Sequence, residues 1–251
     1  MSGTRGLMSQ QQGWRWRQRP GQRWPRVAAV TALGALSLSL ASMLCLHLLA
    51  VSEMSPLADT VSRYAHMAGG GWLFALGALA LSLAFLASAA GMATVGVRFD
   101  GATRTLAVAW GLSLVFVACF PSDPPGTRHT LAGLAHNWAS ASVFLCLPAA
   151  GWRISYTLTG HAAWRGLVRV VRWLAAGAGL ALVAFLLTHP PLHQWYGGVA
   201  LHGVPERVLL GLEAALVLVL STRLLQVARA PASQADPARS ATQRPETAVA
   251  R

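Results

Sequence analysis

The sequence predicts an all-α integral membrane protein, a bundle of six transmembrane helices with both termini in the cytoplasm. Two features of the composition indicate this fold class, since 54% of the 251 residues are hydrophobic and only 11% are charged. A soluble domain carries about a quarter charged residues. A third feature is that the apolar residues form long stretches without the alternation typical of membrane barrels. Helices in lipid are therefore expected.

Six stretches are long enough to cross a bilayer core, which requires roughly 17–25 helical residues. In chain order they are Val27–Ala50, Gly71–Val95, Arg104–Phe120, Leu131–Trp152, Val170–Thr188 and Pro205–Leu225. Residues 1–26 have the pattern of a basic, Trp- and Arg-rich cytoplasmic segment that anchors at the membrane surface. Residues 227–251 have the composition of a disordered cytoplasmic tail. The six-helix domain is thus expected over residues 27–226.

Arginine sets the expected orientation. All 20 basic residues are Arg, and 17 of them lie in the two terminal segments and in the second and fourth connections. Only Arg63, Arg128 and Arg207 lie in the other connections, so the positive-inside rule places both termini in the cytoplasm. This placement also explains the net charge of +12, and we expect no nucleic-acid partner. The use of Arg without Lys is typical of a GC-rich bacterial genome, so the expected location is a bacterial inner membrane.

The predicted spans place seven of the eight histidines on the outer side of the membrane. They are His47, His66, His129, His136, His189, His193 and His202. Most of the acidic residues outside the tails and the span interiors share that side. No nucleotide-binding loop, hydrolase elbow or HExxH sequence is present. Any chemistry is therefore expected at a polar outer face.

The first outer loop has the pattern of a short helix with Ser55 as its N-cap. Asp59 and Arg63 are four residues apart, and so are Ser62 and His66, so each pair could meet on one helix face. One interpretation uses Asp59, Ser62 and His66 as the polar lining of a site. The other is a capped interfacial helix with a surface ion pair, which contributes under about 1 kcal/mol.

The third outer loop contains Asp123, His129 and His136. If the fourth helix begins near His129, the two histidines lie on nearly one face and are separated by roughly 10 Å along the axis. That distance is too long for one metal ion, because a helical zinc pair is normally spaced i, i+4. A divalent metal such as zinc would therefore have to recruit Asp123 or histidines from other loops. A packing role for His136 is the alternative.

The sixth span begins with charged residues. Glu206 is expected in its first turn, where a carboxylate interacts favourably with the helix dipole, and Arg207 follows it. Glu213 lies seven residues further on, well inside the span. A carboxylate at that depth rarely faces lipid, so we expect Glu213 to have a partner or to be protonated.

Several short runs lie at the ends of the predicted spans. The runs are His47-Leu48-Leu49, Pro56 to Tyr64, Gly71 to Phe74, the set Phe120, Pro121, Asp123, His129 and His136, and Gly203 to Arg207. Together they resemble a bacterial membrane family known as domain of unknown function 998. The resemblance covers about residues 27–226 and implies a six-helix integral membrane protein without implying an activity. It also implies that certain polar residues occupy the family's motif positions. These are Ser62, Tyr64, Asp123, His129, His136 and Arg207.

Three functions are compatible with this pattern. The first is a metal-assisted hydrolase or lipid-modifying enzyme that acts on a lipid or small molecule at the outer face. Its catalytic candidates are Asp123, His129, His136, Asp59 and Ser62, and the first three are also the candidate metal ligands. The second is a component of a transporter, with Glu213 and His136 as a proton or ion relay. The third is a sensor or assembly factor whose outer histidines titrate near neutral pH.

Overall fold

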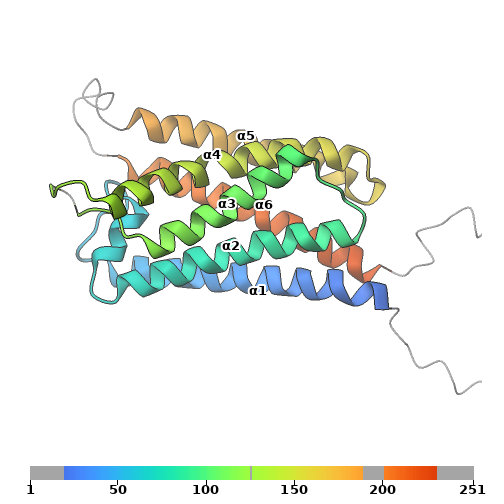
Figure 1. Cartoon of the computed structure of the whole chain (residues 1–251), viewed down its shortest axis with the longest axis horizontal. Coiled ribbons are helices and arrows are strands. Elements are labelled where there is room, and N and C mark those ends of the chain that lie inside the picture. Colours follow the sequence, from blue (N-terminus) through green and yellow to red (C-terminus); the bar gives the residue numbers. More distant parts are fainter. Residues whose placement is uncertain (1–19, 125, 189–200, 231–251) are drawn as a thin grey trace, which may run out of the picture.

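The computed structural model describes residues 20–124, 126–188 and 201–230, and over these ranges every regular element is helical (Figure 1). The elements are α1 (Pro20–Leu49), η1 (Val61–His66), α2 (Gly70–Thr94), α3 (Gly101–Cys119), α4 (Leu131–Thr159), η2 (Ala162–Leu167), α5 (Val168–Leu187) and α6 (Gly203–Arg229), where η1 and η2 are short 3-10 helices. The prediction of an all-α fold is confirmed. Most of the predicted basic segment, most of the predicted tail, and His189 and His193 lie outside the described residues.

Five of the helical segments are long and apolar enough to cross a membrane, which makes the chain a multi-pass membrane protein. They are Arg23–Leu49, Gly70–Thr94, Gly101–Cys119, Ala162–Leu187 and Gly203–Arg229. Helix α4 has 29 residues, which is sufficient length, but it is not among the five. Its first half contains His136, Asn137 and Ser140, which lower its hydropathy. The count of six crossings therefore stays a prediction.

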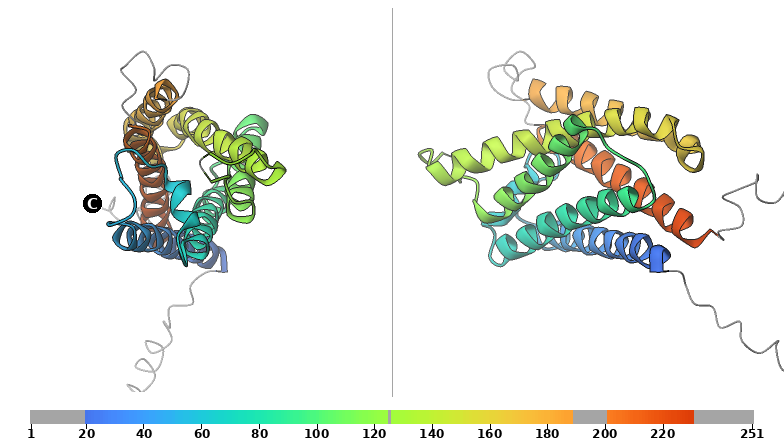
Figure 2. Two further views of the ribbon diagram at one scale, coloured as in Figure 1. Left: turned by 90° about the vertical axis from the view of Figure 1, so that its left-hand side faces the viewer. Right: turned by 45° about the vertical axis from the view of Figure 1, so that its right-hand side comes forward.

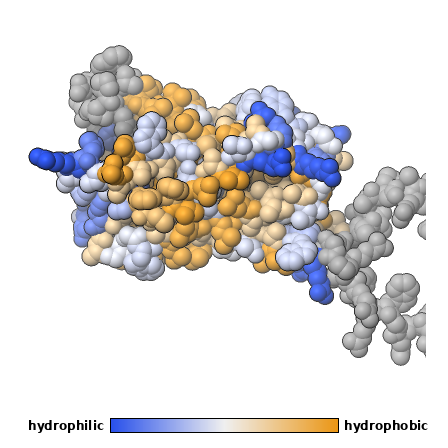
Figure 3. Space-filling model, viewed as in Figure 1, coloured by the Kyte–Doolittle hydropathy of each residue, from blue (hydrophilic) through white to orange (hydrophobic). Residues whose placement is uncertain are grey.

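The outer surface of the helices is apolar. Large side chains such as Leu44, Trp138 and Leu180 are 60%, 72% and 71% exposed. Figure 3 shows hydrophobic residues across the middle of the molecule and hydrophilic residues toward its two ends. An apolar surface of this extent would be unfavourable in water, whereas lipid chains solvate it. The surface therefore agrees with a position in the bilayer.

The six α-helices form a closed ring. Each helix packs against its neighbours in the sequence, and α6 closes the ring against α1. Figure 2 shows this arrangement in the view along the bundle. We call the end with η1, the α3–α4 connection and the start of α6 the η1 end. The opposite end carries η2, the start of α1 and the end of α6, and we call it the η2 end (Figure 1).

Toward the η2 end, side chains of α6 fill the inside of the ring. Leu224 packs against Gly91 of α2, and Leu216 packs against Gly151 of α4, at positions where an added Cβ would collide with the leucine. Fully buried aromatic side chains, including Phe85 and Trp110, add to this packing. The half of the ring at the η1 end is different, because its helices line a cavity.

Candidate functional site

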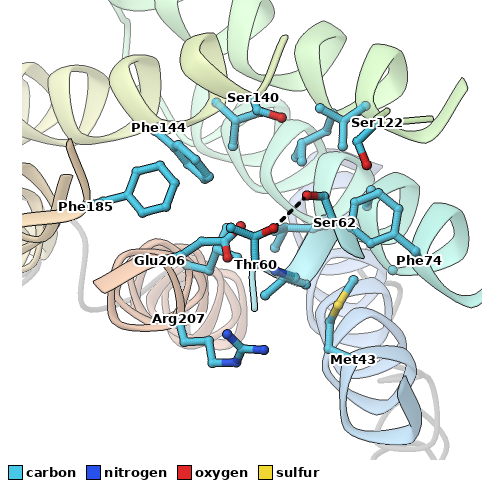
Figure 4. Close-up of a pocket in the computed structure, with 18 of the residues that line it drawn as sticks. Met43, Thr60, Ser62, Phe74, Ser122, Ser140, Phe144, Phe185, Glu206 and Arg207 are labelled. Atoms are coloured by element: carbon cyan, nitrogen blue, oxygen red, sulfur yellow. Dashed lines mark hydrogen bonds between the residues drawn. The ribbon is translucent and has the colours of Figure 1, made fainter. Parts of the chain in front are cut away.

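The cavity at the η1 end has a volume of about 740 Å³, and all six α-helices contribute to its wall. Its apolar wall includes Met43, Leu81, Leu114, Phe144, Phe185 and Leu210. Most of its polar wall lies closer to the end of the bundle, where Thr60 and Ser62 lie near Glu206 of α6 and Ser122 lies across the cavity from that helix (Figure 4). A pocket of this size and composition is typical of a ligand site, since such sites measure roughly 300–1,000 Å³.

One polar side of the cavity is built by residues Ser55–His66, which we call the η1 segment. It makes one turn over Ser55–Asp59 before η1 begins at Val61. The expected helix with Ser55 as N-cap is therefore wrong. Asp59 accepts a hydrogen bond from the Ser55 backbone N–H at 2.8 Å, and its other carboxylate oxygen pairs with Arg63 as expected from their spacing.

The expected contact between Ser62 and His66 is not formed. The Ser62 hydroxyl instead lies 3.2 Å from the Thr60 hydroxyl, and His66 Nε2 lies 3.0 Å from the Ser122 hydroxyl. The reason is that η1 is a 3-10 helix, in which residues three apart share a face. His66 therefore joins the η1 segment to the α3–α4 connection.

The first turn of α6 is joined to the η1 segment by two hydrogen bonds. The Gly203 N–H donates to the Leu57 carbonyl at 3.1 Å, and the Val61 N–H donates to Glu206 Oε2 at 2.8 Å. Gly203 permits this approach, because a Cβ there would lie 2.7 Å from the Asp59 carbonyl oxygen. The bond from Val61 also explains where η1 begins, since a side chain 145 residues away takes the N–H that a continuous helix would use.

Arg207 is the centre of a hydrogen-bond network. Its guanidinium donates to the carbonyl oxygens of Asp59 and Gly203 at 2.7 and 3.0 Å, to the Tyr64 hydroxyl at 2.7 Å and to His47 Nε2 at 2.9 Å. Tyr64 is fully buried, and its ring lies under the guanidinium with 5.4 Å between the two centres. Arg207 thus binds α1, the η1 segment and its own helix together.

The network also assigns the tautomer of His47. An arginine N–H can only donate, so His47 Nε2 must be the accepting, unprotonated nitrogen. The proton then sits on Nδ1, which donates to the Met43 carbonyl at 2.7 Å. The His47 ring also packs edge-on against Tyr64, with the ring centres 4.9 Å apart.

Asp123 and Thr130 together begin α4. The Thr130 side chain is the N-cap and accepts from the Gly133 N–H at 3.0 Å, while Asp123 accepts from the Thr130 hydroxyl at 2.6 Å and from its N–H at 3.0 Å. These bonds from Thr130 hold the pKa of Asp123 below its usual value. The helix therefore begins at Leu131, which is where the fourth predicted span begins, and His129 lies two residues before it.

This start separates the two histidines of the third outer loop. The His129 side chain is 91% exposed, and its Nδ1 lies 3.8 Å from Asp123. His136 is buried on α4, lines the cavity, and donates through Nδ1 to the Phe120 carbonyl at 2.8 Å. In the described ranges of the chain, no three His, Cys, Asp or Glu side chains lie close enough together to hold a metal ion.

Glu206 and Glu213 occupy different surroundings on α6. Glu206 is 5% exposed and lines the cavity. Glu213 is 1% exposed and does not line the cavity. Neither Glu213 oxygen reaches hydrogen-bond geometry with any described residue. Arg207 is engaged elsewhere and is not the partner of Glu213.

The cavity thus brings together many of the residues that the sequence indicated. Ser62, Arg63, Asp123, His136, Glu206 and Arg207 line it, Asp59 and Tyr64 lie directly behind its wall, and His129 and Glu213 lie apart from it. Sequence reasoning missed Thr60, Ser122, Ser140 and the role of His47. For His47, the signal was its place in the motif His47-Leu48-Leu49 at the end of the first span.

The helix ring and the cavity at its η1 end define the class of this molecule, a multi-pass helical membrane protein with a largely apolar pocket. The chain belongs to the family described as protein of unknown function (DUF998), whose profile matches residues 32–223. The resemblance noted from the motifs is thereby confirmed. No curated protein and no solved structure matches the chain.

Proposed function

We propose that this membrane protein binds an amphiphilic, lipid-like molecule in the cavity at the η1 end. The observation that carries the proposal is the division of the cavity wall into a deep apolar part and a polar part near the end of the bundle. A hydrocarbon chain would lie among Leu114, Phe144 and Phe185, where it buries apolar surface without leaving polar groups unpaired. The polar end of the molecule would lie beside the η1 segment.

The shape of the cavity favours binding over passage through the bundle. Its wall reaches Leu81 on α2 and Ala214 on α6, and the leucines that follow on α6 fill the ring beyond this depth. A transporter would require an opening toward the η2 end in some other conformation. A metal-assisted hydrolase would require ligands that the described residues do not bring together. Binding of an amphiphile needs neither.

Photolabelling tests the proposal. The probe is methyl hexadecanoate with a diazirine in its chain, added to the protein in liposomes, and labelled residues are identified by mass spectrometry of peptides. We expect labelling of cavity residues such as Phe144 and Phe185. Labelling that is confined to lipid-facing side chains would contradict the proposal.

A matched pair of variants makes this test specific. Gly211 on α6 lines the cavity and Gly34 on α1 does not, although both are exposed, and an added Cβ at either position would meet no atom within 4 Å. Gly211→Phe should fill part of the cavity and reduce the labelling of its wall at least tenfold. Gly34→Phe should leave that labelling unchanged. Equal labelling in both variants would count against the cavity as the site.

A further inference from the structure

The charged groups around the cavity are largely engaged with the protein itself. Arg207 makes four hydrogen bonds with its five N–H groups. Arg63 pairs with Asp59, and both oxygens of Asp123 accept bonds from Thr130. A ligand that depended on one of these charges would have to break contacts that hold the η1 segment or α4. The polar end of the ligand must therefore be recognised by other groups.

Glu206 has an acceptor that faces the cavity. Its side chain is nine-tenths buried or more, and its Oε2 accepts from the Val61 N–H. Among the described residues, no group donates a hydrogen bond to its Oε1, and that atom is accessible from the cavity. Figure 4 shows the Glu206 carboxyl on the same side of the cavity as the hydroxyls of Thr60 and Ser62. These three side chains form a compact polar patch, which we call the Glu206 patch.

The Glu206 patch favours a group that both donates and accepts hydrogen bonds. The carboxyl oxygen of Glu206 requires a hydrogen-bond donor on the ligand, and a carboxylate, an ester or a quaternary amine has none. An ammonium donates but cannot accept from Thr60 or Ser62, and it would add a second cation beside Arg207. A phosphate or carboxylate would place a second anion against Glu206 in a site of low dielectric. An alcohol satisfies both requirements without adding charge.

We propose that the cavity takes an amphiphile whose polar end is a hydroxyl, as in a long-chain alcohol or an acylglycerol. The hydroxyl donates to Glu206 Oε1 and accepts from Ser62 or Thr60, while the hydrocarbon chain extends toward Phe144 and Phe185. This inference rests on the proposed function, because it assigns the polar end of the same ligand.

Competition between head groups tests the inference. Hexadecanol, hexadecylamine, hexadecanoate and hexadecyl phosphate have the same chain length, and each is added against the photoactivatable methyl ester in liposomes that contain the wild-type protein. Hexadecanol should displace the label at a concentration at least tenfold lower than the two anions, the factor expected for one hydrogen bond to a carboxylate. It should also displace the label at a lower concentration than hexadecylamine.

The possible outcomes separate this inference from the proposed function. If the methyl ester labels the cavity but an anion or the amine competes best, the hydroxyl assignment is overturned and amphiphile binding stands. If the methyl ester does not label the cavity, the proposed function fails first. Equal competition by all four compounds would also overturn the assignment, because it would mean that only the chain is recognised.

Two variants locate the recognition at the Glu206 patch. In Glu206→Gln the amide oxygen can still accept from Val61, which leaves an NH₂ donor facing the cavity. Displacement by hexadecanol should then weaken about tenfold, and displacement by hexadecanoate should improve.

Ser62→Ala should weaken the displacement by hexadecanol severalfold. It leaves the bond between Glu206 and Val61 intact, so it tests the assignment even if Glu206→Gln fails to fold. Ser142→Ala on α4, whose hydroxyl lies near Cys146 and does not line the cavity, is the matched control and should behave as wild type. Unchanged competition in both patch variants would refute the assignment.

Discussion

Arg207 connects three parts of the chain that are far apart in sequence. It reaches His47 across 160 residues and Tyr64 across 143 residues, and each bond uses a different N–H of one planar guanidinium. No other side chain offers five donors in a fixed arrangement. The position therefore requires arginine for its geometry as well as for its charge. This explains how the η1 segment keeps its place beside a cavity of about 740 Å³.

We expect Arg207→Lys to destabilise the protein by about 1–3 kcal/mol, because an ammonium has three donors and cannot reach His47, Tyr64 and two carbonyl oxygens together. The measurement is thermal or denaturant-induced unfolding of the purified protein in detergent. Arg104→Lys is the control, since Arg104 is exposed and its side chain makes no hydrogen bond within the described residues. Equal stability of the two variants would show that the charge alone is sufficient at position 207.

At the level of the elements, hydropathy predicted the helices well and their ends less well. The fourth span was expected to end at Trp152, whereas α4 continues to Thr159, and α1 begins at Pro20 rather than Val27. Hydropathy detects only the part of a helix inside the hydrocarbon core. Backbone hydrogen bonds continue the helix into the polar region of the bilayer, and α1 includes Pro25 inside this extension.

The parts of the site that sequence could not predict depend on contacts between distant residues. Local spacing correctly paired Asp59 with Arg63, which are four residues apart. It could not indicate that Glu206 takes the Val61 N–H, nor that Arg207 binds His47, because these contacts arise only when α6 closes the ring against α1. The predicted start of the fourth span, Leu131, agrees with the start of α4, but the cap could not be predicted, since Asp123 supports Thr130 through a turn of the connection.

The start of α3 gives a prediction at the scale of an element. Asp100 is the N-cap, accepts from the Thr103 N–H at 2.8 Å and pairs with Arg153 of α4, and its bonds from Thr103, followed by those from Arg153, lower its pKa from 3.8 to about 2. Because the folded protein favours the ionised form, this stabilisation is complete above the ordinary pKa and is lost as the pH falls from 3.8 toward about 2.

We expect Asp100→Ala to lower the melting temperature at pH 7 more than Asp100→Asn, because asparagine keeps the cap and loses only the charge. Thermal unfolding in detergent as a function of pH checks both statements. In the asparagine variant, the fall in stability between pH 3.8 and about 2 should be smaller than in the wild type. An identical fall in both proteins would assign the acid sensitivity to other groups.

At the scale of the whole molecule, we expect α4 to cross the membrane with its neighbours in the ring. At about 1.5 Å per residue, its 29 residues extend roughly 44 Å, which exceeds the thickness of a bilayer core. It packs between α3 and α5, both of which are apolar enough to span, and Figure 2 shows it as part of the ring. Its polar residues His136 and Ser140 line the cavity rather than lipid. A polar lining would therefore account for the low hydropathy of α4 if this helix crosses the membrane as we expect.

Single cysteines on either side of α4 test this topology together with the orientation expected from the arginines. In a background without Cys45, Cys119 and Cys146, which are free cysteines, His129→Cys places a thiol before α4 and Arg165→Cys places one after it. A maleimide that cannot cross the membrane should label position 129 in intact cells. It should label position 165 only after permeabilisation, because the η2 end carries most of the arginines and should face the cytoplasm. Labelling of both positions from one side would mean that α4 does not cross, and the reverse pattern would invert the orientation while keeping the crossing.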